Sequence, residues 1–285
     1  MKRFKIGGVP EHFNLPWRLA IEEGKFKSAG IELHWSDMTG GTGQMIKGLQ
    51  AGSLDIAVLL TEGITRAILK GLDAKIISVY VQSPLCWGVH VPANQSFHSL
   101  SDLDGATFAI SREGSGSHLM SFVLAQREGW EPNALSFNVV GDVYGGLWAL
   151  HHGEADGFLW EKYTTQPFVD QAKCKRIGEV FTPWPCFVIA VRSDVLHSDA
   201  ELLQEVLRIV QERAAQLKNA SDAPEVLAWR YALRKNEVEE WLQQTEWAST
   251  TNIDQEVLKK TVETLLELGL ISHQEAAGWS EKLLG

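Results

Sequence analysis

The sequence predicts an α/β protein with two similar domains, each built on a mostly parallel sheet flanked by helices. A segment that runs from a glycine-containing loop through a helix to an apolar strand occurs twice, at residues 39–60 and again at 140–161. Short apolar runs alternate with helical patterns as far as residue 192, and the rest of the chain has almost only helical periodicity. Alternating strands and helices favour parallel sheets, and the helical tail is expected to pack on a domain already formed.

The repeated segment predicts half of a parallel-sheet unit in each copy. Gly52 aligns with Gly153 and Asp55 with Asp156, so a G-x-x-D turn separates helix from strand in both copies. Glycine suits the left-handed position that ends a helix, and the apolar run 56–60 is typical of a strand buried on both faces. Two such units at this spacing indicate two domains that face each other. The alternative is a chance match, since this turn is common between helix and strand in α/β proteins.

The other strands follow from short apolar or β-prone runs that end at turn residues. Residues 31–35 alternate between apolar and polar side chains, which predicts a strand with one buried face. At residue 85 the pattern changes, because the next strand leads into a long polar loop. The predicted strands are 4–8, 31–35, 56–60, 74–81, 87–91, 107–110, 136–140, 157–161, 176–181 and 187–191.

Proline, serine and glycine mark the ends of the predicted helices. Pro16 suits the first turn of a helix. Ser117 is a suitable N-cap for a helix that ends at Gly129. Residues 203–217 and 257–268 repeat apolar side chains at helical spacing, so the tail is predicted to be helical.

Composition excludes several classes of protein. The 285 residues are 45% hydrophobic, enough for one large core or two cores of ordinary domain size. A net charge of -10 argues against a general surface for nucleic acid or anionic membrane. No run of 18 apolar residues occurs, so we predict no membrane insertion. The three cysteines have no C-x-x-C spacing, which indicates neither a disulfide framework nor a zinc site.

Candidate ligand-binding residues follow from the sheet topology. In open parallel sheets, ligands bind outside the carboxyl ends of the strands, where the connections diverge. The loops that follow the predicted strands therefore supply the candidates, together with one tryptophan of the loop TPWP. The candidates are His12, Phe13, Gly40, Gly41, Thr42, Thr61, Glu62, Ser83, Ser115, Gly116, Ser117, His118, Trp160, Glu161 and Trp184.

Two glycine-rich loops indicate recognition of an acidic group. In G-S-G-S-H at 114–118, backbone N–H groups and two serine hydroxyls can hold a carboxylate or sulfonate. The loop G-G-T-G at 40–43 has more glycine than helix capping requires. The alternative for both is a plain helix cap with permissive glycines. Neither is a phosphate-binding P-loop, because no Lys-Ser or Lys-Thr follows at the needed spacing.

Carboxyl and aromatic groups complete the predicted site. Glu62 and Glu161 close the two repeated strands and together suit a cationic or amino-bearing ligand, although solvated glutamates at helix starts fit equally. Trp160 and Trp184 are suited to stack on a planar or apolar part of a ligand, but most of the 11 tryptophans are expected in the core.

Other chemistries have little support. Adjacent His151 and His152 point to different faces of a helix, which makes them a poor metal pair. Cys86 and Cys186 have no evident histidine partner, and no G-x-S-x-G nucleophile elbow occurs. The sequence thus indicates no catalytic residue, no metal and no cofactor.

The order and spacing of these motifs resemble a known family. The motifs are A-x-x-x-G-x-F-x-x-x-G-I from residue 20, G-G-T-G at 40, A-G-S-L-D at 51, S-L-S-D-L-D-G at 99, G-S-G-S-H at 114 and G-E-A-D at 153. They are similar to those of ABC-importer substrate-binding proteins for nitrate, sulfonates, taurine and thiamine-pyrimidine precursors. No single motif is specific, and the resemblance extends to about Lys218.

The resemblance implies the type II periplasmic-binding-protein fold, with two α/β lobes, two crossing strands as a hinge, and a helical C-terminal tail. It implies a discontinuous first lobe, 1–84 plus 189–285, and a second lobe, 85–188. A small organic molecule with an acidic group and a planar or apolar part would be captured in the cleft between the lobes, for ABC import. Ligand contacts in the family come from loops that match Gly40, Gly41, Thr42, Ser115, Ser117 and His118 here.

Two departures keep a second function open. The N-terminus MKRFKIGGVPEHF lacks the apolar stretch of a secretion signal, so we expect a cytoplasmic protein, or a periplasmic or surface-anchored one if a signal has been removed. Glu62 and Glu161 make a simple inorganic anion less suitable. From the resemblance we expect a non-catalytic monomer whose partners are a small molecule and an ABC permease. The missing secretion signal supports the alternative, a cytoplasmic enzyme on the same fold, of the thiamine-pyrimidine or menaquinone-precursor type.

Overall fold

The computed structural model describes residues 1–284 and divides the chain into two compact units. The first unit consists of residues 1–84 and 184–285, and the second of residues 85–183. The sequence-based boundary lies after residue 188 instead. The structure groups residues 184–188 with the first unit because the strand β10, Phe187–Arg192, pairs with two strands of that unit.

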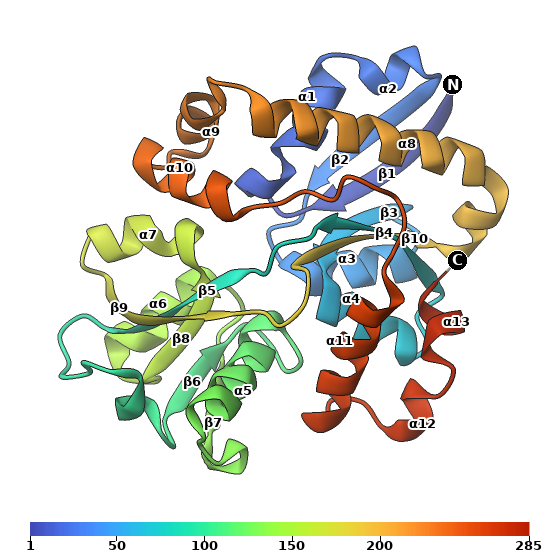
Figure 1. Ribbon diagram of the computed structural model, residues 1–285. Coiled ribbons are helices and arrows are strands. Elements are labelled where there is room, and N and C mark those ends of the chain that lie inside the picture. Colours follow the sequence, from blue (N-terminus) through green and yellow to red (C-terminus); the bar gives the residue numbers. More distant parts are fainter. Residues whose placement is uncertain (285) are drawn as a thin grey trace. The chain divides into compact units, whose positions relative to one another are not determined.

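The first unit is built on a five-stranded sheet with the order β2-β1-β3-β10-β4 (Figure 1). β1, β2 and β3 are parallel, whereas β10 runs antiparallel to both of its neighbours. β3 lies in the middle and is almost wholly buried, as its continuous apolar sequence predicts. The bounds of the strands are β1 Lys2–Gly8, β2 Ile31–Asp37, β3 Ile56–Leu60 and β4 Ala74–Val81.

Helices cover both faces of this sheet. α1, α2 and α8 pack against one another, while α3 and α4 pack against β3 and α11 against α4 (Figure 1). The long helix α8 bends at Asp199, whose backbone is not helical. The helices of the first unit are α1 Leu15–Glu22, α2 Lys25–Ser28, α3 Gly41–Gln50, α4 Thr61–Leu69, α8 Ser193–Asn219, α9 Ala223–Tyr231, α10 Lys235–Gln244, α11 Gln255–Glu267, α12 His273–Ala276 and α13 Trp279–Leu283, with the short 3-10 helix η1 His12–Asn14.

The second unit repeats the same topology with the order β7-β6-β8-β5-β9. β6, β7 and β8 are parallel, and β5 is the antiparallel strand. The elements are β5 Cys86–Pro92, η2 Leu100–Leu103, β6 Thr107–Ile110, α5 Gly116–Glu128, η3 Pro132–Ala134, β7 Ser136–Val139, α6 Val143–His152, β8 Gly157–Glu161, α7 Lys162–Asp170 and β9 Cys174–Phe181. The predicted fold class, two mostly parallel sheets with flanking helices and a helical tail, is therefore confirmed.

The two copies of the repeated segment occupy corresponding places in the two sheets. Each copy gives a helix, a central strand and a second helix: α3, β3 and α4 in the first unit, and α6, β8 and α7 in the second. The aspartate of each G-x-x-D turn has the same structural role. The Asp55 carboxylate accepts the backbone N–H of Lys5 at 2.8 Å, and the Asp156 carboxylate accepts that of Thr107 at 3.0 Å. Both aspartates thus join the central strand to its parallel neighbour, which explains why the motif occurs twice.

The C-terminal part of the chain covers the open edge of β4. Val81 forms an isolated antiparallel bridge with Trp247, and Ile76 forms a parallel bridge with Leu284. The backbone N–H of Gln82 donates to the carbonyl of Glu246 at 2.7 Å. An open strand edge is a template for unwanted pairing, so the tail protects the edge from which the chain leaves the first unit.

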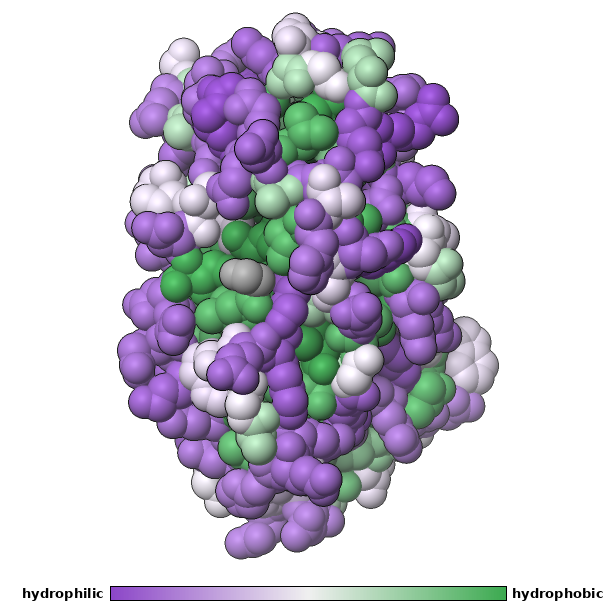
Figure 2. Space-filling model, turned by 90° about the vertical axis from the view of Figure 1, so that its right-hand side faces the viewer, coloured by the Kyte–Doolittle hydropathy of each residue, from purple (hydrophilic) through white to green (hydrophobic). Residues whose placement is uncertain are grey.

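On the face shown in Figure 2, hydrophilic residues predominate, and hydrophobic residues gather mainly toward its middle. In residues 1–284, no helix is both long enough and apolar enough to cross a membrane.

Candidate functional site

Four of the candidate residues meet at the carboxyl end of β3 in the first unit. The hydroxyl of Thr42, at the start of α3, accepts the backbone N–H of Leu60 at 3.2 Å. The hydroxyl of Thr61 donates to the carbonyl of Pro185 at 2.5 Å. The indole N–H of Trp184 donates to Oε2 of Glu62 at 2.9 Å. The beginnings of α3 and α4 are therefore joined to the segment by which the chain re-enters this unit.

Close packing explains the glycine of the T-E-G sequence at the start of α4. A Cβ atom on Gly63 would lie 2.5 Å from Cγ2 of Thr42, which is shorter than any acceptable contact between carbon atoms. Glycine at residue 63 thus allows α3 and α4 to begin side by side.

The carboxyl group of Glu62 has an unusual environment. Its side chain is only 3% exposed, and burial raises its pKa from 4.5 to about 7, because water no longer stabilises the charge. The Trp184 hydrogen bond and the residue's own backbone N–H lower the pKa in part. The other oxygen, Oε1, is buried and has no hydrogen-bond partner among the described residues.

An aromatic cluster lies after β1 in the same unit. The ring of His12 stacks on Phe13, with ring centroids 4.7 Å apart, and meets Trp241 of α10 edge-on at 4.3 Å. Burial lowers the pKa of His12 to about 3, so the imidazole is neutral at pH 7. Trp247 packs against Trp241, and its indole N–H donates to the backbone carbonyl of Phe13 at 3.1 Å. Tail residues therefore fix the position of the loop after β1.

Three other candidates of the first unit have structural partners. The N–H of Gly40 donates to the Gln44 side chain at 2.8 Å, and Gly41 has a left-handed φ of 62°. The hydroxyl oxygen of Ser83 accepts the backbone N–H of Glu246 at 3.1 Å. Gly41 is thus required by the backbone turn, and Ser83 holds the tail against the end of β4.

In the second unit the G-S-G-S-H loop forms the start of α5. The structure places the N-cap at Ser115, whose hydroxyl accepts the N–H of His118, and not at the predicted Ser117. The hydroxyl oxygen of Ser117 instead accepts the backbone N–H of Ser111, just after the end of β6, at 3.0 Å. The His118 ring accepts the N–H of Gly114 through Nδ1 at 2.8 Å. Much of the hydrogen-bonding capacity of the loop is thus used internally.

Some donors at this helix start stay available for an acceptor. The hydroxyl oxygens of Ser115 and Ser117 are 3.0 Å apart and share one of their two protons. Within residues 1–284, the second hydroxyl proton has no recorded acceptor. The N–H groups of Gly116 and Ser117 lie in the first helical turn, where no carbonyl of the helix reaches them. Together with the helix dipole, these donors suit an acidic group.

Trp160 and Glu161 end β8 in the same unit. The Trp160 side chain packs against the core cluster around Phe158, 5.5 Å away between ring centroids. Glu161 caps α7, because its carboxylate accepts the N–H of Thr164 at 2.7 Å. Its pKa is raised by burial, and that hydrogen bond opposes the shift. Core packing, the alternative to ligand contact, accounts for the placement of Trp160. Glu161 begins a helix as expected, but it is a buried cap and not a solvated side chain.

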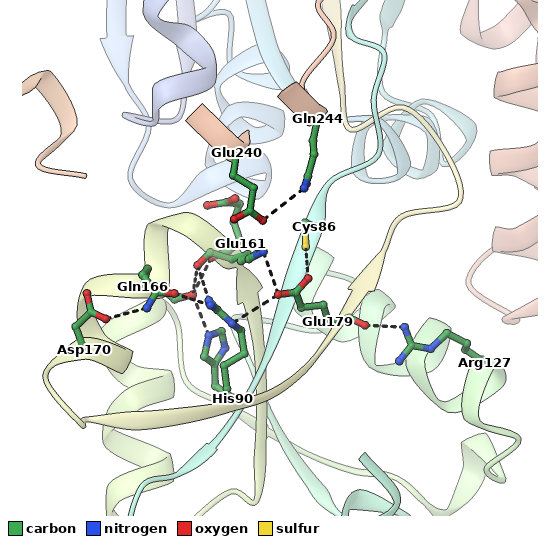
Figure 3. Close-up of polar contacts among 12 residues, drawn as sticks. Cys86, His90, Arg127, Glu161, Gln166, Asp170, Glu179, Glu240 and Gln244 are labelled. Atoms are coloured by element: carbon green, nitrogen blue, oxygen red, sulfur yellow. Dashed lines mark hydrogen bonds and ion pairs between the residues drawn. The ribbon is translucent and has the colours of Figure 1, made fainter. Parts of the chain in front are cut away.

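A polar network that the sequence did not indicate surrounds Glu179 on β9. Its carboxylate forms an ion pair with Lys162 at 3.1 Å and lies 3.8 Å from the Arg176 guanidinium. Figure 3 shows the same carboxylate facing the Cys86 thiol, 3.5 Å away. Burial is the largest cause that raises the pKa of this thiol, so Cys86 is not an activated nucleophile.

Comparison with known proteins gives a consistent result. Residues 87–180 match a family model described as Ca3427-like PBP. The structure of the Candida albicans CA3427 gene product, described as having the generic periplasmic-binding-protein fold, is similar over 100% of this chain and 96% of its own, with a TM-score of 0.91 and 26% identity. A search of curated proteins gives no match.

Two bacterial binding proteins share the architecture at lower identity. The alkanesulfonate-binding protein SsuA from Xanthomonas axonopodis, bound to MOPS, has 15% identity and a TM-score of 0.81, over 98% of both chains. The nitrate-binding protein NrtA from Synechocystis has 14% identity and a TM-score of 0.74, over 99% of this chain and 86% of its own. The chain has the type II periplasmic-binding-protein fold. The resemblance found in the sequence is thus confirmed.

Within this fold, the sequence predictions locate the strand ends but not all the residues beside them. The structure brings Thr42, Thr61, Glu62 and Trp184 together in the first unit, and Ser115 to His118 in the second. It adds Trp241 and Trp247, which the sequence analysis places only within a helical tail. Two tryptophans close together in the chain, one in the last turns of α10 and one just beyond that helix, are the only sequence signal for them. The motifs of the sequence resemblance lie far from both tryptophans in the chain, so they do not indicate where the two side chains pack.

Proposed function

We propose that the protein is a non-catalytic solute-binding protein that closes its two units over a small organic molecule. The donors at the start of α5 would hold an acidic group of this ligand, and the residues around Glu62 would hold its other end. Hinge closure would then be the mechanism, as in other two-lobed binding proteins. An ABC permease would be the partner, with the protein acting as a monomer.

The start of α5 carries this proposal. It offers two first-turn N–H groups and one hydroxyl proton on side chains that are only 2% exposed. The fold supports the same function, since the alkanesulfonate-binding and nitrate-binding proteins named above share it. Their ligands are anions, which is consistent with a donor-rich helix start.

Enzymatic activity on the same fold is the second candidate, and one observation favours it. A carboxyl group with a pKa of about 7, such as that of Glu62, is suited to proton transfer near neutral pH. Thr61, Glu62 and Trp184 would then position a reacting group rather than hold a cargo.

Native mass spectrometry of the purified protein separates the two functions. We expect a co-purifying small molecule at one copy per chain, whose mass is unchanged after incubation with the protein. Conversion of that molecule over repeated turnovers would instead make the protein an enzyme. If neither a bound molecule nor a thermal shift with a panel of small organic acids is found, the proposal of solute binding fails.

Replacing Gly116 with leucine is expected to weaken ligand binding by roughly a hundredfold, because the side chain would cover the first-turn N–H groups of α5. Residue 116 has no left-handed backbone conformation, so leucine introduces no backbone strain there, and circular dichroism of the variant checks that it folds. Titration calorimetry with the co-purified molecule measures the change.

Gln126→Leu is the matched control for this substitution. Gln126 is exposed on the same helix, three turns from the loop, so the same side chain there should leave affinity unchanged. Equal affinity in the two variants would show that the start of α5 is not the acid-binding element.

A further inference from the structure

Residues 246–248, here called the tail segment, pair with the end of β4, close to where the chain leaves the first unit. They belong to the stretch that joins α10 to α11 (Figure 1). The carbonyl of Glu246 accepts the N–H of Gln82 at 2.7 Å, and its own N–H donates to the Ser83 hydroxyl at 3.1 Å. The carbonyl of Tyr80 accepts the N–H of the last residue of the tail segment at 2.9 Å. The tail segment thus holds the last residues before the first connection between the units.

The ammonium group of Lys218 fixes where the tail segment begins. Lys218 lies near the end of α8, and its Nζ donates to the carbonyl of Thr245 at 2.6 Å and to that of Leu242. Both carbonyls lie at the end of α10, where a helix leaves its last carbonyls without partners in the helix. A positive charge at this end also interacts favourably with the helix dipole. Because residue 246 follows directly, one side chain sets both the end of α10 and the position of the tail segment.

The tail segment also holds the loop after β1, which carries two of the candidate ligand residues. The carbonyl of Phe13 in that loop accepts the indole N–H of Trp247 at 3.1 Å and the hydroxyl of Tyr80 at 2.8 Å. One donor comes from the tail segment and the other from the part of β4 beside it. The ring of His12 stacks on that of Phe13. A displacement of the tail segment would therefore break a contact of this loop.

The returning chain is joined to the same place. The chain leaves the first unit after Pro84 and re-enters it at Trp184. Just beyond the point of re-entry, the N–H of Cys186 donates to the carbonyl of Ser83 at 3.1 Å. The tail segment is thus bonded to the first connection directly and to the second through Ser83. Hinge motion is absorbed by a few residues, and this support leaves it to those at the two connections.

We propose that Lys218 is a positioning residue for the closure of the protein, because through the tail segment it holds the loop after β1 and both connections as one rigid group. Loss of its two hydrogen bonds would loosen the tail segment, and the loosening would reach Phe13 and Ser83 through the contacts above. A small molecule that fixes the loop after β1 would also restrict the hinge, which couples capture to closure. The effect on ligand binding rests on the proposed function, whereas the effect on the backbone does not.

Hydrogen–deuterium exchange of the protein without added ligand, followed at single amides by NMR, tests this support. Lys218→Met removes both hydrogen bonds and keeps a long apolar side chain. We expect the amides of Gln82 and Glu246 to exchange at least roughly tenfold faster, because hydrogen bonds from a charged group are strong. The amides of Asn14 and Cys186 donate to carbonyls outside the tail segment, yet they should also exchange faster. A residue that only caps α10 would leave these two amides unchanged.

Ser83→Ala is a second and milder variant. It removes only the hydroxyl that accepts the Glu246 N–H, so it decides the question if Lys218→Met does not fold. Exchange at Glu246 and Cys186 should again be faster. Lys260→Met on α11 and Ser249→Ala just beyond the tail segment are the matched controls, because both side chains are exposed. They should leave the exchange of all these amides unchanged.

Titration calorimetry with the co-purified molecule, once its mass has identified it, measures the effect on binding. Lys218→Met should bind this molecule roughly tenfold more weakly, a typical size for coupling between two sites. Lys260→Met should bind it as tightly as the original chain does.

Each outcome has a distinct meaning. Faster exchange confined to residues 242–248, or no change at any amide, would overturn the role of Lys218 as a positioning residue. Unchanged affinity in Lys218→Met would overturn its role in ligand binding and leave solute binding intact. Absence of any bound small molecule overturns the proposed function alone, because the exchange experiment uses the protein without added ligand.

Discussion

Replacement of Trp241 with alanine is expected to lower the free energy of unfolding by about 3 to 5 kcal/mol, as for other large aromatic side chains truncated in a core. Trp241 is 2% exposed and contacts the rings of His12, Phe13 and Trp247. Its removal would leave a cavity between the tail and the loop after β1. Urea denaturation followed by circular dichroism measures the loss.

Trp229 provides a matched control for this prediction. It lies on the neighbouring helix α9 and is 84% exposed, so Trp229→Ala should change the free energy of unfolding by less than about 0.5 kcal/mol. Trp241→Phe should be milder than Trp241→Ala, since it keeps a ring and removes an indole N–H that has no acceptor among residues 1–284. Equal losses in the two alanine variants would contradict the described packing of α10.

Glu62→Gln is expected to make the protein more resistant to unfolding at pH 8 than at pH 5, relative to the original chain. The pKa of Glu62 is about 7 in the folded state against an ordinary value of 4.5. Between these values the folded protein keeps a proton that the unfolded chain has lost, so stability falls as pH rises through 7. The glutamine cannot ionise, and the relative gain from pH 5 to pH 8 is roughly 2 kcal/mol.

Denaturation midpoints at a series of pH values check this prediction. The difference between the variant and the original chain should grow from pH 5 to pH 7 and then level off. Glu201→Gln should show no such growth, because that side chain is exposed. A difference that is constant over the whole range would mean that Glu62 is ionised in the folded protein at pH 5.

Local sequence patterns were sufficient to predict the elements of the fold. Apolar runs such as Ile56–Leu60 and the alternating run from Ile31 form strands where expected. The repeated G-x-x-D turn correctly indicated two units with equivalent sheets. Such patterns involve residues that are close together in the chain, so they can be recognised without the tertiary structure.

The start of α5 shows where local patterns become insufficient. Both Ser115 and Ser117 are suitable caps by residue type, and the choice depends on Ser111, which attracts one of the hydroxyls at the end of β6. Trp160 illustrates the same limit, since a tryptophan at a strand end suits either a ligand or a core. Its packing around Phe158 depends on α6 and β8 together.

By itself, the sequence determined the strands, the helices, the two-unit α/β architecture and the loops in which ligand groups would lie. Only the tertiary structure decided which of those groups are already used and which are not. The hydroxyl of Ser83 already accepts a hydrogen bond from the backbone of Glu246, which is 163 residues away in the chain. One oxygen of Glu62 accepts a hydrogen bond from Trp184, whereas the other has no partner among residues 1–284. Hydrogen bonds between residues so far apart in the chain leave no periodicity in the sequence, because they arise from how the elements pack.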